Sequence, residues 1–438
     1  MRKTHLLYAL LIVVLCAMPC IGWAQQRLMT LDEVFSLAEQ NSVAIDASRL
    51  ALTEAEQAIV EAKTGRLPDI ELKASASYLG NGTLTDRNFA NATNIKMPHF
   101  GNNFAVEAAQ LIYGGGVVSN AVAMAELKRE MANINLDDTR SRVRLLLTGF
   151  MLDLHKMQSI LEVYDRNIAL QEELIADTKA RSREGIALSN DVTRQELRLQ
   201  QMLLQRKEVE NTTRILSSDL ATTIGIDPTT EIIPDKASLN IALSATDESY
   251  WQSLAEEHNA NLKRSELAVA MSERGEKLAK AERRPNIVLV AANHFDGPIT
   301  IEVPVIDKNF NYWYVGVGVS FKLSSLYKAN RTIQRQATAT ERSRRELDDT
   351  RQRTSMAIHA DYIRYEEAYF AEETNRKSVE LAESNYRVVE QRYQNDIALI
   401  TDMVDAANQL LDAELQLSIS RINILMRYYQ LMATVGTL

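Results

Sequence analysis

The sequence has few of the residues that carry enzymatic or metal chemistry. Both of its cysteines, Cys16 and Cys20, lie within the first 24 residues, so the rest of the chain can form no disulfide bond. The six histidines are scattered, without the spacing of metal ligands. There is no P-loop and no GxSxG motif. We therefore expect neither an enzyme nor a metal or other cofactor.

Basic surfaces and long apolar runs are also lacking. The formal net charge is −9 at pH 7, and no basic run is interleaved with aromatic residues, which argues against nucleic acid as a partner. After residue 24, no stretch is long and apolar enough to be a transmembrane helix.

Residues 1–24 have the pattern of a secretory signal peptide. Arg2 and Lys3 form a charged start, residues 6–18 are apolar, and small residues precede an expected cleavage after Ala24. The apolar segment is shorter than a bilayer-spanning helix needs. We therefore expect the mature chain to begin at Gln25 and to leave the cytoplasm.

Proline is scarce, and its absence from long stretches predicts unusually long helices. None of the eight prolines lies within residues 305–438 or between residues 99 and 227. We predict long helices over about 117–184 and 326–393, with return helices over about 190–224 and 400–434. The helix over about 117–184 is supported by an apolar seam whose residues are alternately four and three positions apart. The seam consists of Val143, Leu147, Phe150, Leu154, Met157, Leu161, Tyr164 and Ile168.

Four segments predict strands, over about 68–79, 103–113, 286–296 and 311–323. The segment 286–296 is nearly continuously apolar, and the other three have a period of two. The last is the clearest, because Trp313, Val315 and Val317 alternate with Tyr314, Gly316 and Gly318. Each segment has about ten residues, the length that a tilted strand needs to cross a bilayer.

The order helix, strand, strand, long helix and return helix occurs twice. Residues 25–245 form the first copy and residues 246–438 the second. Ile186-Ala187-Leu188 is echoed by Ile397-Ala398-Leu399, and Pro68 and Pro285 precede corresponding strands. We interpret this order as two internal structural repeats.

Four strands cannot close a barrel, and lipid does not tolerate open strand edges. A membrane barrel would therefore have to be shared between chains. Two chains would give eight strands and three would give twelve, and the strand pattern alone does not choose between them.

An ordinary soluble sheet remains a second interpretation of the strands. A periplasmic coiled-coil adaptor or a structural protein without a pore is the second interpretation of the whole chain.

Together these features resemble the TolC-like outer-membrane efflux proteins, also called outer membrane factors, over essentially the whole mature chain. The residues that carry the resemblance are Leu31-Asp32-Glu33, Pro68, Pro285, Leu111-Ile112-Tyr113-Gly114-Gly115, the run from Ile400 to Ala406, and Val435-Gly436-Thr437-Leu438.

The resemblance implies an α+β membrane protein that forms a homotrimer. A shared 12-stranded β-barrel would lie among the lipids of the outer membrane of a Gram-negative bacterium. A long antiparallel α-helical barrel would extend into the periplasm. Such a channel is the exit duct of a tripartite efflux or type I secretion system. It receives substrates from a periplasmic membrane-fusion adaptor and an inner-membrane pump of the RND or ABC type.

The resemblance also implies a gate at the periplasmic tip. Asp402 and Asp405 match two aspartates that form constricting rings in the family, and Asp191 and Tyr393 match a bonded pair that holds the tip shut. From the residues alone, Asp402 and Asp405 share a helix face, and the pattern favours their being charges at a helix N-terminus.

Glycines punctuate the predicted turns. Gly114 and Gly115 stand at a strand-to-helix hinge, and Gly185 stands at the tip turn of the first hairpin. The chain departs from the family at three further positions of the tip. Ala398 stands where some members have arginine, Asp396 where a turn glycine is expected, and Ser182 where a tyrosine often occurs.

Overall fold

The computed structural model describes residues 26–237, 246–395 and 397–438. The expected signal peptide and Asp396 lie outside the described residues. The helices are α2 (Leu31–Asn41), α3 (Val43–Thr64), α4 (Val117–Arg183), α5 (Ser189–Thr223), α6 (Glu248–His258), α7 (Ala260–Ala281), α8 (Ser325–Gln394) and α9 (Ile400–Val435). The strands are β1 (Gln26–Met29), β2 (Asp69–Tyr78), β3 (Gly82–Leu84), β4 (Thr93–Ile95), β5 (Phe100–Tyr113), β6 (Glu231–Pro234), β7 (Asn286–Gly297) and β8 (Phe310–Ser320). Within the described ranges, none of these helices has an apolar stretch that could cross a lipid bilayer.

The chain divides into two compact units. The helical unit comprises the residues up to 47 together with 138–259 and 354–438, and the sheet unit comprises residues 48–137 and 260–353. The helical unit therefore contains both hairpin turns, whereas the sheet unit contains β2, β5, β7 and β8.

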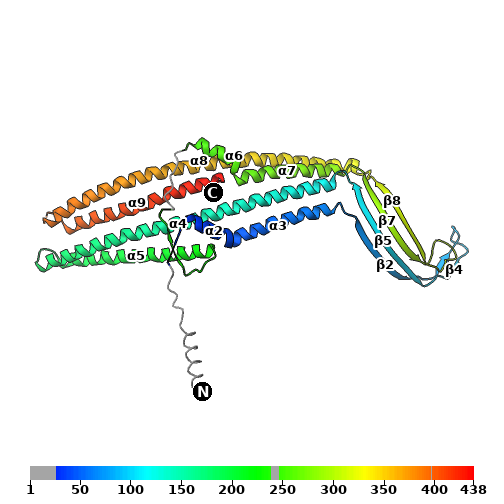
Figure 1. Ribbon diagram of the computed structural model, residues 1–438, viewed down its shortest axis with the longest axis horizontal. Coiled ribbons are helices and arrows are strands. Elements are labelled where there is room, and N and C mark those ends of the chain that lie inside the picture. Colours follow the sequence, from blue (N-terminus) through cyan, green and yellow to red (C-terminus); the bar gives the residue numbers. More distant parts are fainter. Residues whose placement is uncertain (1–25, 238–245, 396) are drawn as a thin grey trace, which may run out of the picture. The chain divides into compact units, whose positions relative to one another are not determined.

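In the helical unit, α5 folds back along α4 and α9 folds back along α8 (Figure 1). One apolar cluster joins three of these helices: Ile160, Val163, Tyr164, Ile168, Met202 and Leu411. The buried band on α4 is wider than the predicted seam, since Met151 and Val163 are buried beside it. The reason is that α4 packs against both α5 and α9, so that two of its sides are covered.

Polar side chains are buried within the same three-helix packing. Asn167 donates to the Glu414 carboxylate at 2.8 Å, which joins α4 to α9. Gln171 donates to the side-chain oxygen of Gln195 at 2.6 Å, which joins α4 to α5. Because a buried amide that loses its partner is costly, these bonds oppose any sliding of the helices along one another.

Two breaks between consecutive helices serve as anchor points. The break between α2 and α3 follows Asn41, whose Nδ2 donates to the carbonyl of Ile224 at the end of α5 at 3.1 Å. The break between α6 and α7 falls at Asn259, whose Nδ2 donates to the carbonyl of Thr434 near the end of α9 at 2.7 Å. Each return helix is thus tied at its C-terminal end by an asparagine.

The sheet unit is built on an antiparallel sheet in the order β2-β5-β7-β8 (Figure 1). Two strand bounds differ from the prediction by three residues. β5 begins at Phe100 because Tyr78 of β2 extends the pairing to it. β8 ends at Ser320, since its last partner on β7 is Asn286, the residue after Pro285.

The sheet has one apolar and one polar face. Pairing places Leu72, Val106 and Trp313 on the apolar face, and Lys73, His294 and Tyr312 on the polar face. The apolar face is uncovered, with Leu72 exposed by 76% and Trp313 by 74%. The outer edges of β2 and β8 pair with no other described strand.

Candidate functional site

The two hairpin turns begin their return helices with the same contact. Asp191 is the third residue of α5, and its carboxylate accepts the N–H of Leu188 at 3.1 Å. Asp402 is the third residue of α9, and its carboxylate accepts the N–H of Leu399 at 3.0 Å. Both aspartates therefore satisfy an N-terminal donor and lie at the positive end of a helix dipole.

Asp405 lies one helical turn beyond Asp402, and both carboxylates are exposed. The two side chains thus share an accessible face at the start of α9. Asp402 caps the start of α9. Asp405 lies three residues further along the helix and is not part of that cap. This geometry leaves both charges available to a solute that approaches the hairpin turn.

An arginine side chain of α5, Arg198, lies near this acidic face. The Nη1 atom of Arg198 donates to the carbonyl of Val404 at 3.4 Å. Burial lowers the pKa of the Arg198 guanidinium, and the nearby carboxylates of Asp412 and Asp405 oppose that shift. Arginine stays protonated in proteins, so Arg198 offsets part of the negative charge of Asp405.

The structure does not contain the expected bond between Asp191 and Tyr393. The hydroxyl of Tyr393 is buried and makes no hydrogen bond within the described ranges. The ring of Tyr393 instead lies 4.7 Å from the guanidinium carbon of Arg181, and Arg181 also donates to the carbonyl of Gln394 at 3.4 Å. The contact between the ends of α4 and α8 is therefore a cation–π contact.

The two tip turns close with matching backbone bonds. Gly185 has φ of +78°, which favours glycine whatever the space around it. The N–H of Ile186 donates to the carbonyl of Arg181 at 2.9 Å, and the N–H of Ile397 donates to the carbonyl of Arg392 at 2.8 Å. The position of Asp396, where a glycine was expected, lies outside the described residues.

The predicted hinge glycines stand at the junction of β5 and α4. Gly115 has φ of +67°, and a Cβ there would lie 2.8 Å from Cβ of Arg284 and 2.9 Å from the carbonyl oxygen of Ala281. A Cβ on Gly114 would lie 3.1 Å from a methyl group of Leu111. Gly115 therefore permits a close approach of the end of α7, which holds this junction in place.

Sequence reasoning missed the apolar character of the two turns. Ile186, Leu188, Ile397 and Leu399 are exposed by 59% to 70%. The repeated Ile-Ala-Leu was visible in the sequence, but it served there only as a sign of the repeat. Four large apolar side chains are therefore exposed at the two turns of the single chain.

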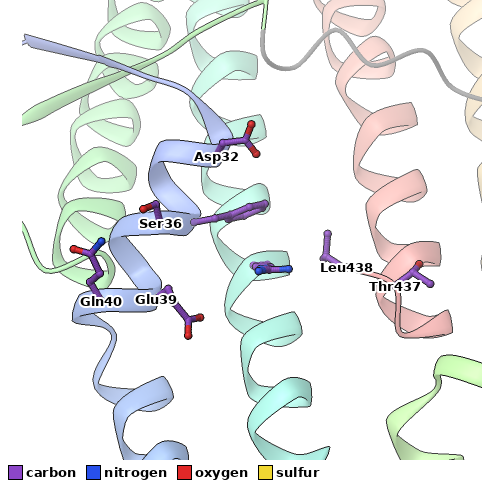
Figure 2. Close-up of a pocket in the computed structure, with 8 residues that line it drawn as sticks. Asp32, Ser36, Glu39, Gln40, Thr437 and Leu438 are labelled. Carbon is purple, nitrogen blue, oxygen red and sulfur yellow. The ribbon is translucent and has the colours of Figure 1, made fainter.

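A shallow groove beside α2 is a separate feature of the helical unit (Figure 2). Figure 2 shows Asp32, Ser36, Glu39 and Gln40 on α2, with Thr437 and Leu438 across the groove. Arg140 donates to the Glu39 carboxylate at 2.7 Å, and the Arg144 guanidinium lies 5.6 Å from the Phe35 ring centroid. These contacts fasten α2 to α4, so we assign this groove a structural role.

Within the described ranges, no group of three or more histidine, cysteine or acidic side chains is placed to hold a metal ion.

Solved structures resemble this chain closely in fold. The outer-membrane protein VceC of Vibrio cholerae is 14% identical and has a TM-score of 0.75, with 93% of this chain and 96% of that chain covered. The outer-membrane channel OprN is 14% identical and has a TM-score of 0.76, with 93% and 90% covered. CusC, whose structures concern transmembrane channel formation, is 11% identical and has a TM-score of 0.77, with 93% and 92% covered.

This chain has the fold of an outer-membrane channel protein. The fold that the resemblance to the TolC-like proteins implies for the single chain is thereby confirmed, whereas the shared trimeric barrel and the two repeats stay predictions. No protein-family model matches the sequence, and no curated protein does.

The cap formed by Asp402 can be separated from its charge. We expect Asp402→Ala to destabilise the start of α9 by about 1 kcal/mol, because the N–H of Leu399 loses its acceptor. Asp402→Asn keeps a carbonyl oxygen in place and should retain most of that stability. Amide hydrogen exchange over residues 399–404 measures both. Equal loss of protection in the two variants would show that the charge, and not the hydrogen bond, holds the helix start.

The contact at Tyr393 makes a second prediction. Tyr393→Phe should leave the tip unchanged or slightly more stable, because it removes a buried hydroxyl without a partner and keeps the ring under Arg181. Tyr393→Leu should loosen the turn, with at least a fivefold loss of exchange protection at residues 394–398, as expected for about 1 kcal/mol. A similar loss in Tyr393→Phe would instead indicate a hydrogen bond made to another chain.

Proposed function

We propose that this chain is the protomer of a homotrimeric outer-membrane channel, the exit duct of a tripartite efflux or type I secretion system. One observation carries the proposal: the four-stranded sheet has an uncovered apolar face and two unpaired edges. In water, such a sheet would normally be covered by a second layer. In a membrane, lipid covers the apolar face and neighbouring strands satisfy the edges.

Closure of the sheet requires further copies of the chain. Three copies provide twelve strands, and this number follows from the resemblance to the TolC-like proteins rather than from the strands themselves. The likeness to OprN, whose structure is that of an outer-membrane channel, supports the same arrangement. In this trimer the polar faces of the sheets line the water-filled interior, and the α-hairpins form the periplasmic helical barrel.

The tips are the surface that we assign to partner proteins. Ile186 and Leu188 on one turn and Ile397 and Leu399 on the other offer exposed apolar side chains. A periplasmic membrane-fusion adaptor would cover them, and an inner-membrane pump of the RND or ABC type would supply the substrate. Covering four large apolar side chains stabilises a complex through the hydrophobic effect.

Asp402 and Asp405 are the gate in this proposal. Three copies would place six carboxylates around the axis, where like charges favour water and cations. Arg198 moderates the ring, because it faces Asp405 from within the same chain. Tyr393 contributes to closure through Arg181, whereas Asp191 begins α5.

A periplasmic coiled-coil adaptor without a pore is the alternative function. It would account for the long hairpins but provides no cover for the sheet. Two positions on β2 distinguish these functions: Leu72 is on the apolar face and Ser75 is on the polar face, and both are exposed in the single chain. A soluble sheet would accept arginine at either position.

We therefore expect Leu72→Arg to impair assembly of the trimer, while Ser75→Arg assembles normally. A lipid-facing arginine near the bilayer centre costs about 2–4 kcal/mol, whereas one that faces water costs little. The measurements are the detergent-corrected mass by light scattering and the conductance in planar bilayers. A water-soluble monomer without conductance, equally tolerant of both substitutions, would overturn the channel and favour the adaptor.

The gate makes a separate prediction for the assembled channel. Asp402→Asn combined with Asp405→Asn should weaken block by hexamminecobalt(III) by about tenfold or more, because each 1.4 kcal/mol of lost attraction changes binding by about that factor. Asparagine at position 402 keeps the helix cap. The matched control is Asp191→Asn, which neutralises the corresponding aspartate of the first hairpin and should leave the block unchanged. An unaltered block in the double variant would remove the gate assignment.

A further inference from the structure

A row of charged and aromatic side chains crosses the polar face of the sheet. Its members are Glu71, Lys73, Glu107, His294, Tyr312 and Tyr314. Register places Glu71 opposite Glu107, and His294 opposite Tyr312. The Nζ atom of Lys73 lies 2.8 Å from the Glu107 carboxylate and 3.3 Å from that of Glu71. The row therefore spans all four strands over two adjacent register levels, one with Glu71, Glu107 and Tyr314 and the other with Lys73, His294 and Tyr312.

The imidazole of His294 lies among the tyrosine rings of β8. Its centroid is 5.1 Å from that of Tyr312 and 6.2 Å from that of Tyr314, and both pairs are stacked within 14° of parallel. Such stacking holds the imidazole at a defined place on the polar face.

The charges of the row do not cancel. Lys73 neutralises one of the two carboxylates, so the row carries one negative charge per chain while His294 is neutral. Glu107 on β5 is the titratable group that faces His294 from that strand, and from β8 only the two tyrosines do so. On β7 itself, Asp296 lies two residues away and accepts a hydrogen bond from Asn103 at 2.5 Å.

Neighbouring positions on the polar face are mostly small or neutral. They include Ser75, Ser77, Ala109, Gly316 and Gly318. Two further carboxylates, Asp69 and Asp296, lie on the same face on either side of the row. A solute that passes along the face therefore meets a negatively charged region there.

We infer that this row forms a cation-preferring ring inside the strand region of the channel, and that protonation of His294 switches the preference off. The inference rests on the proposed function, because the trimer turns the polar face toward the pore and repeats the row three times. With His294 neutral, the ring carries three negative charges, which attract small cations such as K⁺ and repel anions. With His294 protonated, the ring is neutral.

The test is the reversal potential of the reconstituted channel in a tenfold KCl gradient, measured at pH 8 and at pH 5. These values lie on either side of the ordinary histidine pKa of about 6.5, while tyrosine stays neutral at both. The channel carries Asp402→Asn and Asp405→Asn, so that the tip carboxylates do not contribute. We expect the permeability ratio of K⁺ to Cl⁻ to fall about fivefold between pH 8 and pH 5, a factor appropriate to unit charges about 4 Å apart in water.

In this background, His294→Gln should keep the pH 8 ratio at both pH values. Lys73→Gln should raise the ratio, and Glu107→Gln should lower it. The matched control is His99→Gln, because His99 is also stacked on a tyrosine, Tyr78 at 5.1 Å, but lies outside the row. It should leave the pH dependence intact.

The outcomes separate the two proposals. A conducting trimer whose selectivity is unaffected by His294→Gln and by Lys73→Gln overturns the ring and leaves the channel standing. A pH dependence that disappears in His99→Gln rather than in His294→Gln also overturns the ring. A protein that forms no trimer and conducts no ions overturns the channel, and the ring with it.

Discussion

A β-sheet must satisfy its edges and cover its apolar face, and the sheet of this chain does neither alone. Leu72 and Trp313 are exposed by 76% and 74% on one face, while β2 and β8 end the sheet without further partners among the described strands. Both requirements are met together if copies of the chain close the sheet within lipid. The proposed trimer, its pore and the position of the charged row all depend on this single requirement.

The helical unit meets a different requirement, which is to keep very long helices in register. Apolar seams alone allow neighbouring helices to slip by a heptad, because each repeat resembles the next. The buried bonds from Asn167 to Glu414 and from Gln171 to Gln195 can form in only one alignment. Like a polar residue in a coiled-coil core, they favour specificity of packing over maximal stability.

Periodicity predicted the strands and the long helices well, because both are properties of local sequence. Alternation along β8 identified its two faces. Helix bounds were within a few residues of those observed, but the covered sides of α4 were not predictable. Their extent depends on which neighbours pack against α4, and residues distant in the sequence provide those neighbours.

The candidate site was predictable where it follows from chain order and hidden where it depends on contacts between hairpins. Asp402 and Asp405 stand out in the sequence because they begin a helix. Arg198 does not, because only packing brings α5 against the carbonyl of Val404. Similarly, the sequence offered a partner for the Tyr393 hydroxyl, but the structure places the ring against Arg181 and leaves that hydroxyl unbonded in the chain.

The asparagine anchors have a mechanical consequence for the return helices. α9 has 36 residues and is held near its C-terminal end by the bond from Asn259 to Thr434. At 1.5 Å per residue, the helix is a lever about 54 Å long with a fixed pivot. A rotation of about 5° at that pivot would carry the opposite end about 5 Å sideways, an estimate from the same rise per residue. A small angular change, with no unfolding of the helix, would therefore suffice for a large displacement of Asp402.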